Sequence, residues 1–363
     1  MVGSTRRVGA RSSRRGARSK RVHLRKILVG VAALATPMGL SIGSLATAAG
    51  GATRATGGSV LRVGYFASLA GGAAPALGTH FGWFRKAGLR VSFVPFTAAP
   101  AAAAALVGGS IDMYAGGMNG AINGLAGYAR IVALDDYDND AYLLSSPRSG
   151  ITSIAGLRGK SVGYTEGTNS QIVLQLALDS AHMTLHDVNA INLEPTAIVS
   201  AFDSGKIDAA SIYLPFEAAI TSAIAGTHVL GRASRFLGQS AIPLVWVASD
   251  RAISSEKPEI LKFLGVLAKA RTYRASHLRQ TAGIVDAFAK APSIKPFLDQ
   301  MTAEGWPTSR AVLSFYKDGG MQLAWQRIDK VLVQAGIAKS LLPASKVMDL
   351  SLDESVLGSF VSQ

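Results

Sequence analysis

Short apolar segments alternate with longer helical segments through most of this chain. Apolar runs at residues 60–65, 89–95 and 112–115 predict strands, and residues 73–84 and 98–106 between them predict helices. Strands that alternate with helices of about ten residues are typical of βα units and a largely parallel sheet. The first part of the chain therefore predicts an α/β fold.

The same alternation restarts after residue 150. Residues 160–164 and 208–213 predict strands, and residues 170–180 predict a helix whose apolar residues share one face. Residues 242–249 predict a strand that returns the chain to the first lobe, and residues 256–340 predict mainly helices. A second lobe is therefore expected to be inserted into the first.

A repeated phrase supports this division. Residues 106–112 are echoed by residues 202–208, and in both an apolar run ends near a glycine and restarts with Ile-Asp. One αβ unit that occurs twice predicts two similar lobes with a cleft between them, which favours a ligand clamp over a single-core enzyme. We expect residues 59–147 and 245–363 to form lobe 1 and residues 148–244 to form lobe 2, with the two crossings acting as a hinge.

The charge of the chain is concentrated at its N-terminus. The formal net charge is +14, but residues 1–49 hold ten Arg and Lys and no acidic residue. The remainder has 27 basic and 23 acidic residues, a net charge of +4, so the basicity does not indicate nucleic-acid binding.

The N-terminal segment has the layout of a secretory signal. Residues 6–26 are cationic, residues 27–45 are mostly apolar, and the small residues at 46–48 predict cleavage after Ala48. Residues 19–25 resemble a twin-arginine export signal with one Arg replaced by Lys, while an ordinary secretory signal and a retained anchor stay open as alternatives. Residues 49–58 predict a flexible leader. We expect the protein to be exported, to a periplasmic or other extracytoplasmic location.

The chain has no cysteine. This excludes disulfides, thiolate catalysis, thiolate metal sites and a lipid anchor on an N-terminal cysteine.

Several segments resemble one known family. Residues 82–89, 104–112, 154–163 and 213–217 carry the likeness, in the order and spacing found there. Across residues 60–250 the chain resembles the periplasmic solute-binding proteins of ABC importers of the nitrate, sulfonate and taurine group, which includes thiamine-precursor binders. The resemblance implies a two-lobed type II periplasmic-binding-protein fold, in which each lobe is a mainly parallel sheet flanked by helices and the ligand cleft lies between the lobes.

The resemblance also implies a function. A monomer would capture a small anionic or zwitterionic solute by hinge closure and deliver it to an ABC permease, with no cofactor, no metal and no nucleic acid. Alternatives are an enzyme on the same fold, lyase or desulfinase-like, and a sensor without a permease. The desulfinase relatives use a cysteine, which this chain lacks. Sulfonate, taurine-like amine, nitrate, pyrimidine precursor and aromatic acid all remain open as ligands.

The first candidate site lies in the second lobe. Thr168, Asn169 and Ser170 follow Gly167 where a strand passes into a helix. A helix N-terminus suits an anionic head group because its N–H groups are unpaired, although an ordinary Ser/Thr cap explains the same residues. The resemblance favours the ligand site, since the family holds ligand at this turn.

Matching residues are expected across the cleft, because ligands of open α/β sheets bind at the carboxyl ends of strands. The candidates that follow strands there are Tyr65, Phe66, Gly117 and Asn119. A further candidate is Tyr213, at the end of the repeated αβ unit in the second lobe, which could pack against the ligand. Each has an alternative role in a turn or in the core.

Carboxylates would favour an ammonium group or a ring nitrogen on the ligand. Glu166 and Glu217 flank the second-lobe site and are candidates for this role. A solvated acidic loop is the favoured interpretation for four aspartates: Asp135, Asp136, Asp138 and Asp140. Likewise, a solvated helix face is predicted for Arg271, Arg274 and Arg279.

Overall fold

The computed structural model describes residues 59–118, 127–138, 140–237, 242–291, 293–303, 305–334 and 338–362. These belong to one compact unit. The predicted signal segment, the predicted leader and Asn119 lie outside the described residues. None of the described helices has the length and apolar character needed to cross a membrane.

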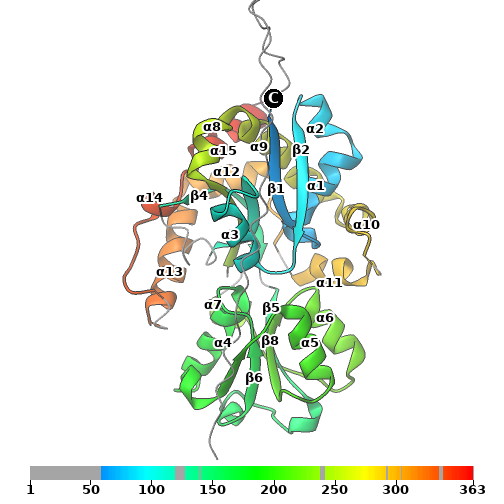
Figure 1. Ribbon diagram of the computed structural model, residues 1–363, viewed down its shortest axis with the longest axis vertical. Helices are drawn as coiled ribbons and strands as arrows, with labels where there is room; N and C mark the ends of the chain where they lie inside the picture. The colour runs from blue at the N-terminus through cyan, green and yellow to red at the C-terminus, as the bar shows by residue number, and fades with distance from the viewer. Residues whose placement is uncertain are drawn as a thin grey trace, which may run out of the picture. The chain divides into compact units, whose positions relative to one another are not determined.

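The first sheet has five strands in the order β2-β1-β3-β10-β4 (Figure 1). β1 runs parallel to β2 and β3, whereas β10 is antiparallel to β3 and β4. All eight residues of β10 are buried, which places this strand at the centre of the lobe. The bounds are β1 (Val60–Phe66), β2 (Arg90–Phe96), β3 (Met113–Gly117), β4 (Ala129–Asp138) and β10 (Ile242–Ser249).

The second sheet repeats this topology in the order β7-β6-β8-β5-β9. Here β6 is parallel to β7 and β8, and β5 is the antiparallel strand. The bounds are β5 (Ala141–Ser145), β6 (Ser161–Tyr164), β7 (Asn189–Asn192), β8 (Ala209–Tyr213) and β9 (His228–Arg232). The predicted α/β fold class, with two sheets flanked by helices, is confirmed. The sheets were expected to be mainly parallel but are mixed, because each has two parallel and two antiparallel strand pairings. One strand differs in place, because β5 was expected in the first lobe and pairs with β8 and β9 of the second.

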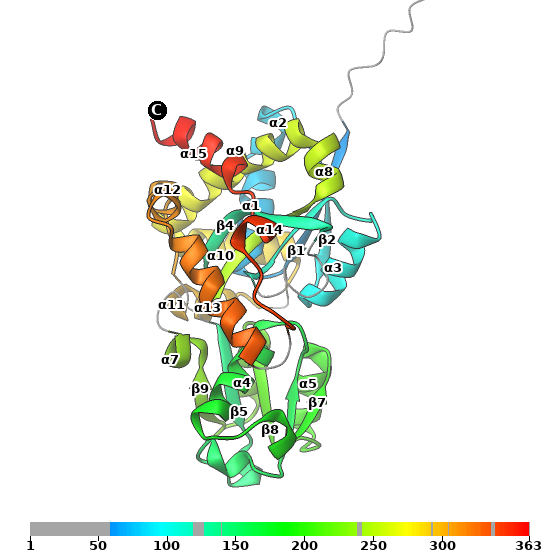
Figure 2. The same cartoon turned by 90° about the vertical axis from the view of Figure 1, so that its left-hand side faces the viewer.

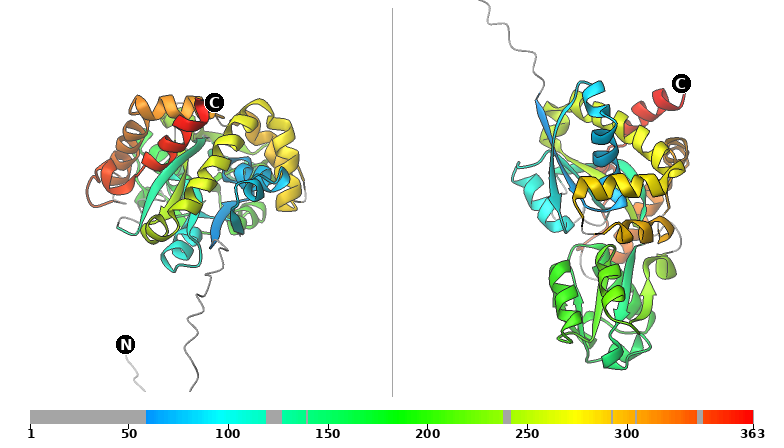
Figure 3. Two further views of the ribbon diagram at one scale, coloured as in Figure 1. Left: turned by 90° about the horizontal axis from the view of Figure 1, so that it is seen from above. Right: turned by 90° about the vertical axis from the view of Figure 1, so that its right-hand side faces the viewer.

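Helices flank both sheets, as the views in Figures 2 and 3 show. The second lobe carries α4 (Asn169–Ser180), α5 (Pro195–Asp203), α6 (Phe216–Ala223) and α7 (Ala233–Leu237). The first lobe carries α1 (Leu69–His80), α2 (Trp83–Lys86), α3 (Ala99–Val107), α8 (Asp250–Ser255), α9 (Lys257–Ser276), α10 (Leu278–Ala289), α11 (Lys295–Ala303), α12 (Ser309–Lys317), α13 (Gly320–Gln334), α14 (Ala344–Val347) and α15 (Ser351–Val361). Of these, α11 also contacts α6 and α13 also contacts α4, so the C-terminal helices touch both lobes.

The aspartate of the repeated Ile-Asp phrase makes the same hydrogen bonds to a neighbouring strand in each lobe. Asp112 Oδ2 accepts a hydrogen bond from the backbone N–H of Arg62 at 2.9 Å, and Asp208 Oδ2 accepts one from the backbone N–H of Ser161 at 2.9 Å. The aspartate N–H groups donate back to the carbonyls of Arg62 and Ser161. Each aspartate thus fixes the start of the inner strand, β1 or β6, beside the strand that follows the phrase.

The isoleucine of each phrase fixes the same pair of strands through packing. A Cβ added to Gly64 would lie 3.0 Å from Ile111 Cδ1, and one added to Gly163 would lie 2.7 Å from Ile207 Cδ1. Glycine is therefore required on the inner strand so that the isoleucine can cover it. This contact and the aspartate hydrogen bonds set the register of β1 with β3 and of β6 with β8.

Replacing Asp112 tests this role. Its side chain is 3% exposed and is also paired with Arg62 and Arg251. Asp112→Asn should lower the free energy of unfolding by about 1–3 kcal/mol, because charge-assisted hydrogen bonds are lost in a buried site. Chemical denaturation measures this, with the exposed Asp179→Asn as the control that should change little.

The fall in the free energy of unfolding caused by Asp112→Asn should also depend on pH. Burial raises the pKa of the Asp112 carboxyl, but the hydrogen bonds from Arg62 and Arg251 lower it more, so that the net pKa lies below 3.8. A lowered pKa means that the ionised carboxyl stabilises the fold above the unfolded-state pKa, and that this stability disappears as the pH falls through the folded-state value. The gap between wild type and Asp112→Asn should therefore narrow below about pH 4. A gap that is constant with pH would contradict this account.

Candidate ligand-binding site

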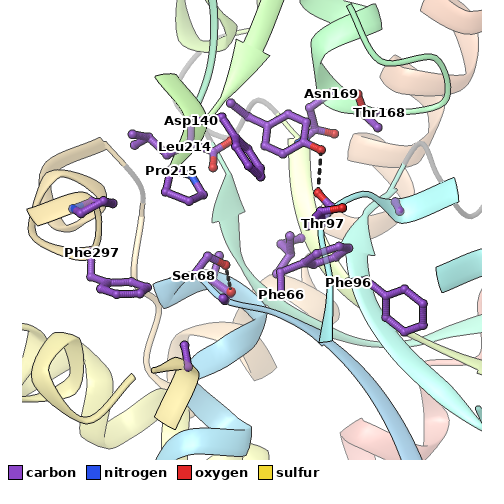
Figure 4. Close-up of a pocket in the computed structure, with 18 of the residues that line it drawn as sticks. Phe66, Ser68, Phe96, Thr97, Asp140, Thr168, Asn169, Leu214, Pro215 and Phe297 are labelled. Atoms are coloured by element: carbon purple, nitrogen blue, oxygen red, sulfur yellow. Dashed lines mark hydrogen bonds between the residues drawn. The ribbon is translucent and has the colours of Figure 1, made fainter. Parts of the chain in front are cut away.

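A cavity of about 460 Å³ lies where the carboxyl ends of strands from both sheets face each other. Figure 4 shows first-lobe residues on one side of it and second-lobe residues on the other. The first lobe contributes Phe66, Ala67, Ser68, Ala70, Phe96, Thr97, Ala99, Gly117, Leu244, Ala289, Lys290, Ala291, Ser293, Pro296 and Phe297. The second contributes Asp140, Gly167, Thr168, Asn169, Tyr213, Leu214, Pro215, Phe216 and Ala219. Most of these side chains are apolar.

The turn before α4 is held in place by its own side chains. Thr168 caps the helix by accepting from the N–H of Ser170, and its hydroxyl donates to the Thr165 carbonyl at 2.7 Å. The Ser170 hydroxyl accepts from the Thr165 N–H at 3.0 Å. Gly167 N–H donates to Gln171 Oε1 at 2.8 Å. These bonds keep the first turn of α4 facing the cavity.

A hydrogen bond between the two lobes crosses the mouth of the cavity. The Tyr213 hydroxyl, at the end of β8, donates to the Thr97 carbonyl, just after β2, at 3.1 Å. Figure 4 marks this bond at Thr97. It joins the carboxyl ends of two strands that belong to different sheets, so the two lobes are in direct polar contact beside the cavity.

Among the described residues, the lining contains one carboxylate and one ammonium group. Asp140 precedes β5 and is 6% exposed. Lys290 follows α10, is exposed and has a φ of 52°, an uncommon left-handed conformation for a residue other than glycine. Within the described residues, neither arginine nor histidine lines the cavity.

Five of the ten residues predicted from the sequence line this cavity: Phe66, Gly117, Thr168, Asn169 and Tyr213. Asn119 lies outside the described residues. The other four are described but do not line it: Tyr65, Glu166, Ser170 and Glu217.

Each of the four has another place. Tyr65 points into the first-lobe core, where its ring packs on Phe93 and Phe288, because successive strand residues face opposite sides. Ser170 is buried in the turn described above. Exposed Glu166 accepts a hydrogen bond from the Asn192 side chain at 3.2 Å. These residues support the wall of the cavity or lie behind it.

Glu217, on α6, lies half-buried near α11 of the first lobe. Burial of its carboxyl, with the negative charge of Asp299, raises its pKa, although Thr221 and Lys295 act in the opposite direction. Glu217 is not among the described lining residues, and its contact with a cationic group of the ligand stays a prediction.

The sequence reasoning missed much of the apolar wall. Phe96 and Thr97 lie at the carboxyl end of a predicted strand. The expectation that ligands bind at the carboxyl ends of strands, which identified Phe66, therefore applied to them as well. Pro296 and Phe297 come from a helical region with no distinctive motif, and nothing in the sequence placed it at the cleft.

Comparison with known proteins identifies the family. The sequence pattern of the NMT1/THI5-like family matches residues 76–280, more than half of the chain. The chain belongs to the NMT1/THI5-like family. This confirms the resemblance found in the sequence.

Individual proteins are similar to this NMT1/THI5-like chain in sequence or in fold. A protein of Brucella abortus, provisionally named a binding protein, is 29% identical over 78% of this chain and 88% of its own length. The crystal structure of the periplasmic aliphatic sulphonate binding protein of Escherichia coli has 21% identity and a TM-score of 0.61, covering 80% of this chain and 92% of that one. A desulfurization enzyme has a similar fold, with a TM-score of 0.58 and 11% identity over 83% of this chain and 99% of its own.

A buried ionic network lies beneath the cavity floor of this NMT1/THI5-like chain. Arg274 donates to Asp135 Oδ1 at 3.0 Å, to Asp136 Oδ2 at 3.3 Å and to the Leu69 carbonyl at 3.2 Å. Asp135 Oδ2 in turn accepts from the Gly71 N–H at 2.9 Å. Ala70 and Gly71 are the non-helical residues at the start of α1, so the network fixes the segment that lines the cavity.

The burial of charged side chains in this lobe and beside the cavity corrects two predictions. Asp135, Asp136 and Asp140 are buried, so the solvated acidic loop is wrong for these three. Arg271 and Arg274 are 0% and 1% exposed, so the solvated arginine face is wrong for them as well. Arg271 pairs with Asp353, which also accepts from the Tyr316 hydroxyl at 2.8 Å. A charge pattern along the sequence could not show which acidic and basic residues would meet.

Two substitutions separate the buried arginine from an exposed one nearby. Arg274→Leu should lower the free energy of unfolding by about 3–5 kcal/mol, because it removes the guanidinium from two buried carboxylates. Arg279→Leu makes the same change at an exposed position and should alter stability by less than about 0.5 kcal/mol. Denaturant unfolding measures both; equal effects would contradict the network's role.

Proposed function

We propose that this protein captures a small organic anion or zwitterion outside the cytoplasm and delivers it to an ABC permease. The observation that supports this most directly is the cavity, since strand ends of two similar lobes both line it. Its volume lies in the range of small-molecule sites, about 300–1,000 Å³. The aliphatic sulphonate binding of the Escherichia coli protein supports an organic anion.

Capture would work by closure of the two lobes. The chain passes between the sheets twice, between β4 and β5 and between β9 and β10. A ligand that touches both lobes binds the closed form best and shifts the population towards it. We infer that Thr168 and Asn169 at the α4 N-terminus hold the head group, while residues of the first lobe cover it.

The proposal includes no catalysed reaction of the solute. The similarity of the fold to a desulfurization enzyme concerns the fold alone. The cysteine on which desulfinase relatives depend is missing from the sequence, and the described lining offers no histidine as a base. We propose that the solute leaves unchanged.

The proposed location rests on the N-terminal segment and on the periplasmic relative. An apolar stretch that follows a long cationic region directs export and removes the protein from the cytoplasm. The export route, cleavage after Ala48 and a monomeric state remain predictions from the sequence.

Thermal unfolding of the purified chain against sulfonates, carboxylates, amines and nitrate tests capture. A ligand of the folded state at a hundredfold excess over Kd should stabilise the protein by about 2.7 kcal/mol. We expect at least one organic acid to raise the melting temperature by several degrees and to be recovered unchanged. Recovery of a converted compound would contradict the proposal.

A matched pair of variants locates the binding. Ala219 and Ala223 are both exposed and lie one turn apart on α6, but only Ala219 lines the cavity. Ala219→Trp should fill the cavity and abolish the ligand-induced shift, whereas Ala223→Trp should retain it. Retention in both variants would place the ligand elsewhere.

Removing the bond across the cavity mouth tests closure. Tyr213→Phe deletes the hydroxyl that donates to Thr97, a contact worth about 0.5–1.5 kcal/mol. The ligand-free variant should be more open and have a larger radius of gyration in solution scattering than wild type. Saturating ligand should restore the wild-type radius; an unchanged radius without ligand would contradict a role for this bond in closure.

A further inference from the structure

The cavity wall is dominated by rings and other apolar groups. Phe66 ends β1, Phe96 ends β2, and Phe297 on α11 is 2% exposed, and all three line the cavity from the first lobe. Leu214 and Pro215 face them from the second lobe, as Figure 4 shows. A small inorganic anion would lose its hydration among these groups and gain little in return. The ligand must therefore bring apolar surface of its own.

The three first-lobe rings also lack aromatic partners. Tyr65, one residue before Phe66, packs on two other rings, and Phe93 and Phe288 pair with each other. By contrast, within the described part of the chain Phe66, Phe96 and Phe297 form no stacked, tilted or edge-to-face pair with another aromatic ring, although Phe66 and Phe96 are neighbours on adjacent strands. Aromatic rings attract one another in offset and edge-to-face arrangements. Three unpaired rings around one cavity are suited to a ligand that supplies a fourth.

The charged lining residues limit the number of acidic groups. A negative group is disfavoured beside the buried carboxylate of Asp140 and favoured beside the ammonium of Lys290. The cavity has no arginine among its described lining residues to pair with a second anion. One acidic group, directed away from Asp140, is what this arrangement accepts.

We propose that the solute is an aromatic compound with a single acidic group, whose ring lies among Phe66, Phe96 and Phe297. This rests on the proposed capture function and narrows its ligand class. Taurine and nitrate would fill only a small part of the cavity and would leave the three rings uncovered. Aryl sulfonates and aryl carboxylates share the required chemistry.

Matched ligands test the ring. Titration calorimetry on the full chain should compare benzenesulfonate and benzoate with cyclohexanesulfonate and hexanesulfonate, which have six-carbon bodies without a π system. The better aromatic acid should bind at least tenfold more tightly than either saturated sulfonate, equal to about 1.4 kcal/mol. Benzylamine serves as the charge control and should bind at least tenfold more weakly than that acid.

Two variants show whether the cavity rings cause the preference. Phe66→Leu keeps an apolar side chain but removes the ring, and should reduce the aromatic-over-saturated ratio at least threefold. Phe288→Leu makes the same change on a ring that packs on Tyr65 outside the lining, and should leave the ratio unchanged. An unchanged ratio in Phe66→Leu would overturn the assignment of the ring to this residue.

The outcomes separate this inference from the capture function. Saturated sulfonates that bind as tightly as the better aromatic acid would overturn the aromatic class while leaving capture intact. Tighter binding of benzylamine than of the acids would overturn the acidic group. Absence of binding by every organic acid would overturn both the inference and the proposed function.

Discussion

One aspartate in each lobe holds the strands whose ends line the cavity. Asp112 fixes the start of β1 beside β3, and Asp208 fixes the start of β6 beside β8. Since a slip of one residue would turn every side chain to the opposite face, this register decides which residues reach the cleft. With it, Phe66 faces the cavity and Tyr65 the core. The repeated phrase is thus a structural device that makes two equivalent halves of one site.

The first lobe adds a second constraint below the cavity. Arg274 joins Asp135, Asp136 and the start of α1, so that the non-helical residues Ala70 and Gly71 keep one conformation. Buried ion pairs are costly to form, and their clearest benefit is to fix geometry. Here the fixed geometry is that of the cavity wall formed by Ser68 and Ala70. The cavity can remain apolar because the charges that order it lie behind it.

Sequence reasoning predicted the two-lobed α/β fold because strand and helix periodicity depends on local residues. Thr168, predicted at a strand-to-helix turn, and Tyr213, predicted at the end of the repeated unit, both line the cavity. Sequence reasoning failed where contacts join distant segments: Arg274 meets Asp135, and Phe297 reaches a cavity that begins at Phe66. It also included Tyr65 with Phe66, although the alternation of a strand allows only one of two neighbours to face the ligand. Burial of Asp135 and Asp136 could not be predicted from the sequence, because their partner Arg274 is more than a hundred residues away.

Both lobes contribute residues to the cavity, and each contributes a different kind of surface. The second lobe presents a helix N-terminus and a short polar turn, and the first presents rings on a rigid floor. The aromatic acid that we propose as the solute would satisfy both sides and draw the lobes together. Tyr213 and Thr97 already join the lobes at the mouth.

A crystal structure of the protein with benzenesulfonate tests this account most directly. The account predicts the ring among Phe66, Phe96 and Phe297, with the sulfonate directed away from Asp140 and contacts from both lobes. A ligand bound outside the cleft, or held by one lobe alone, would contradict it.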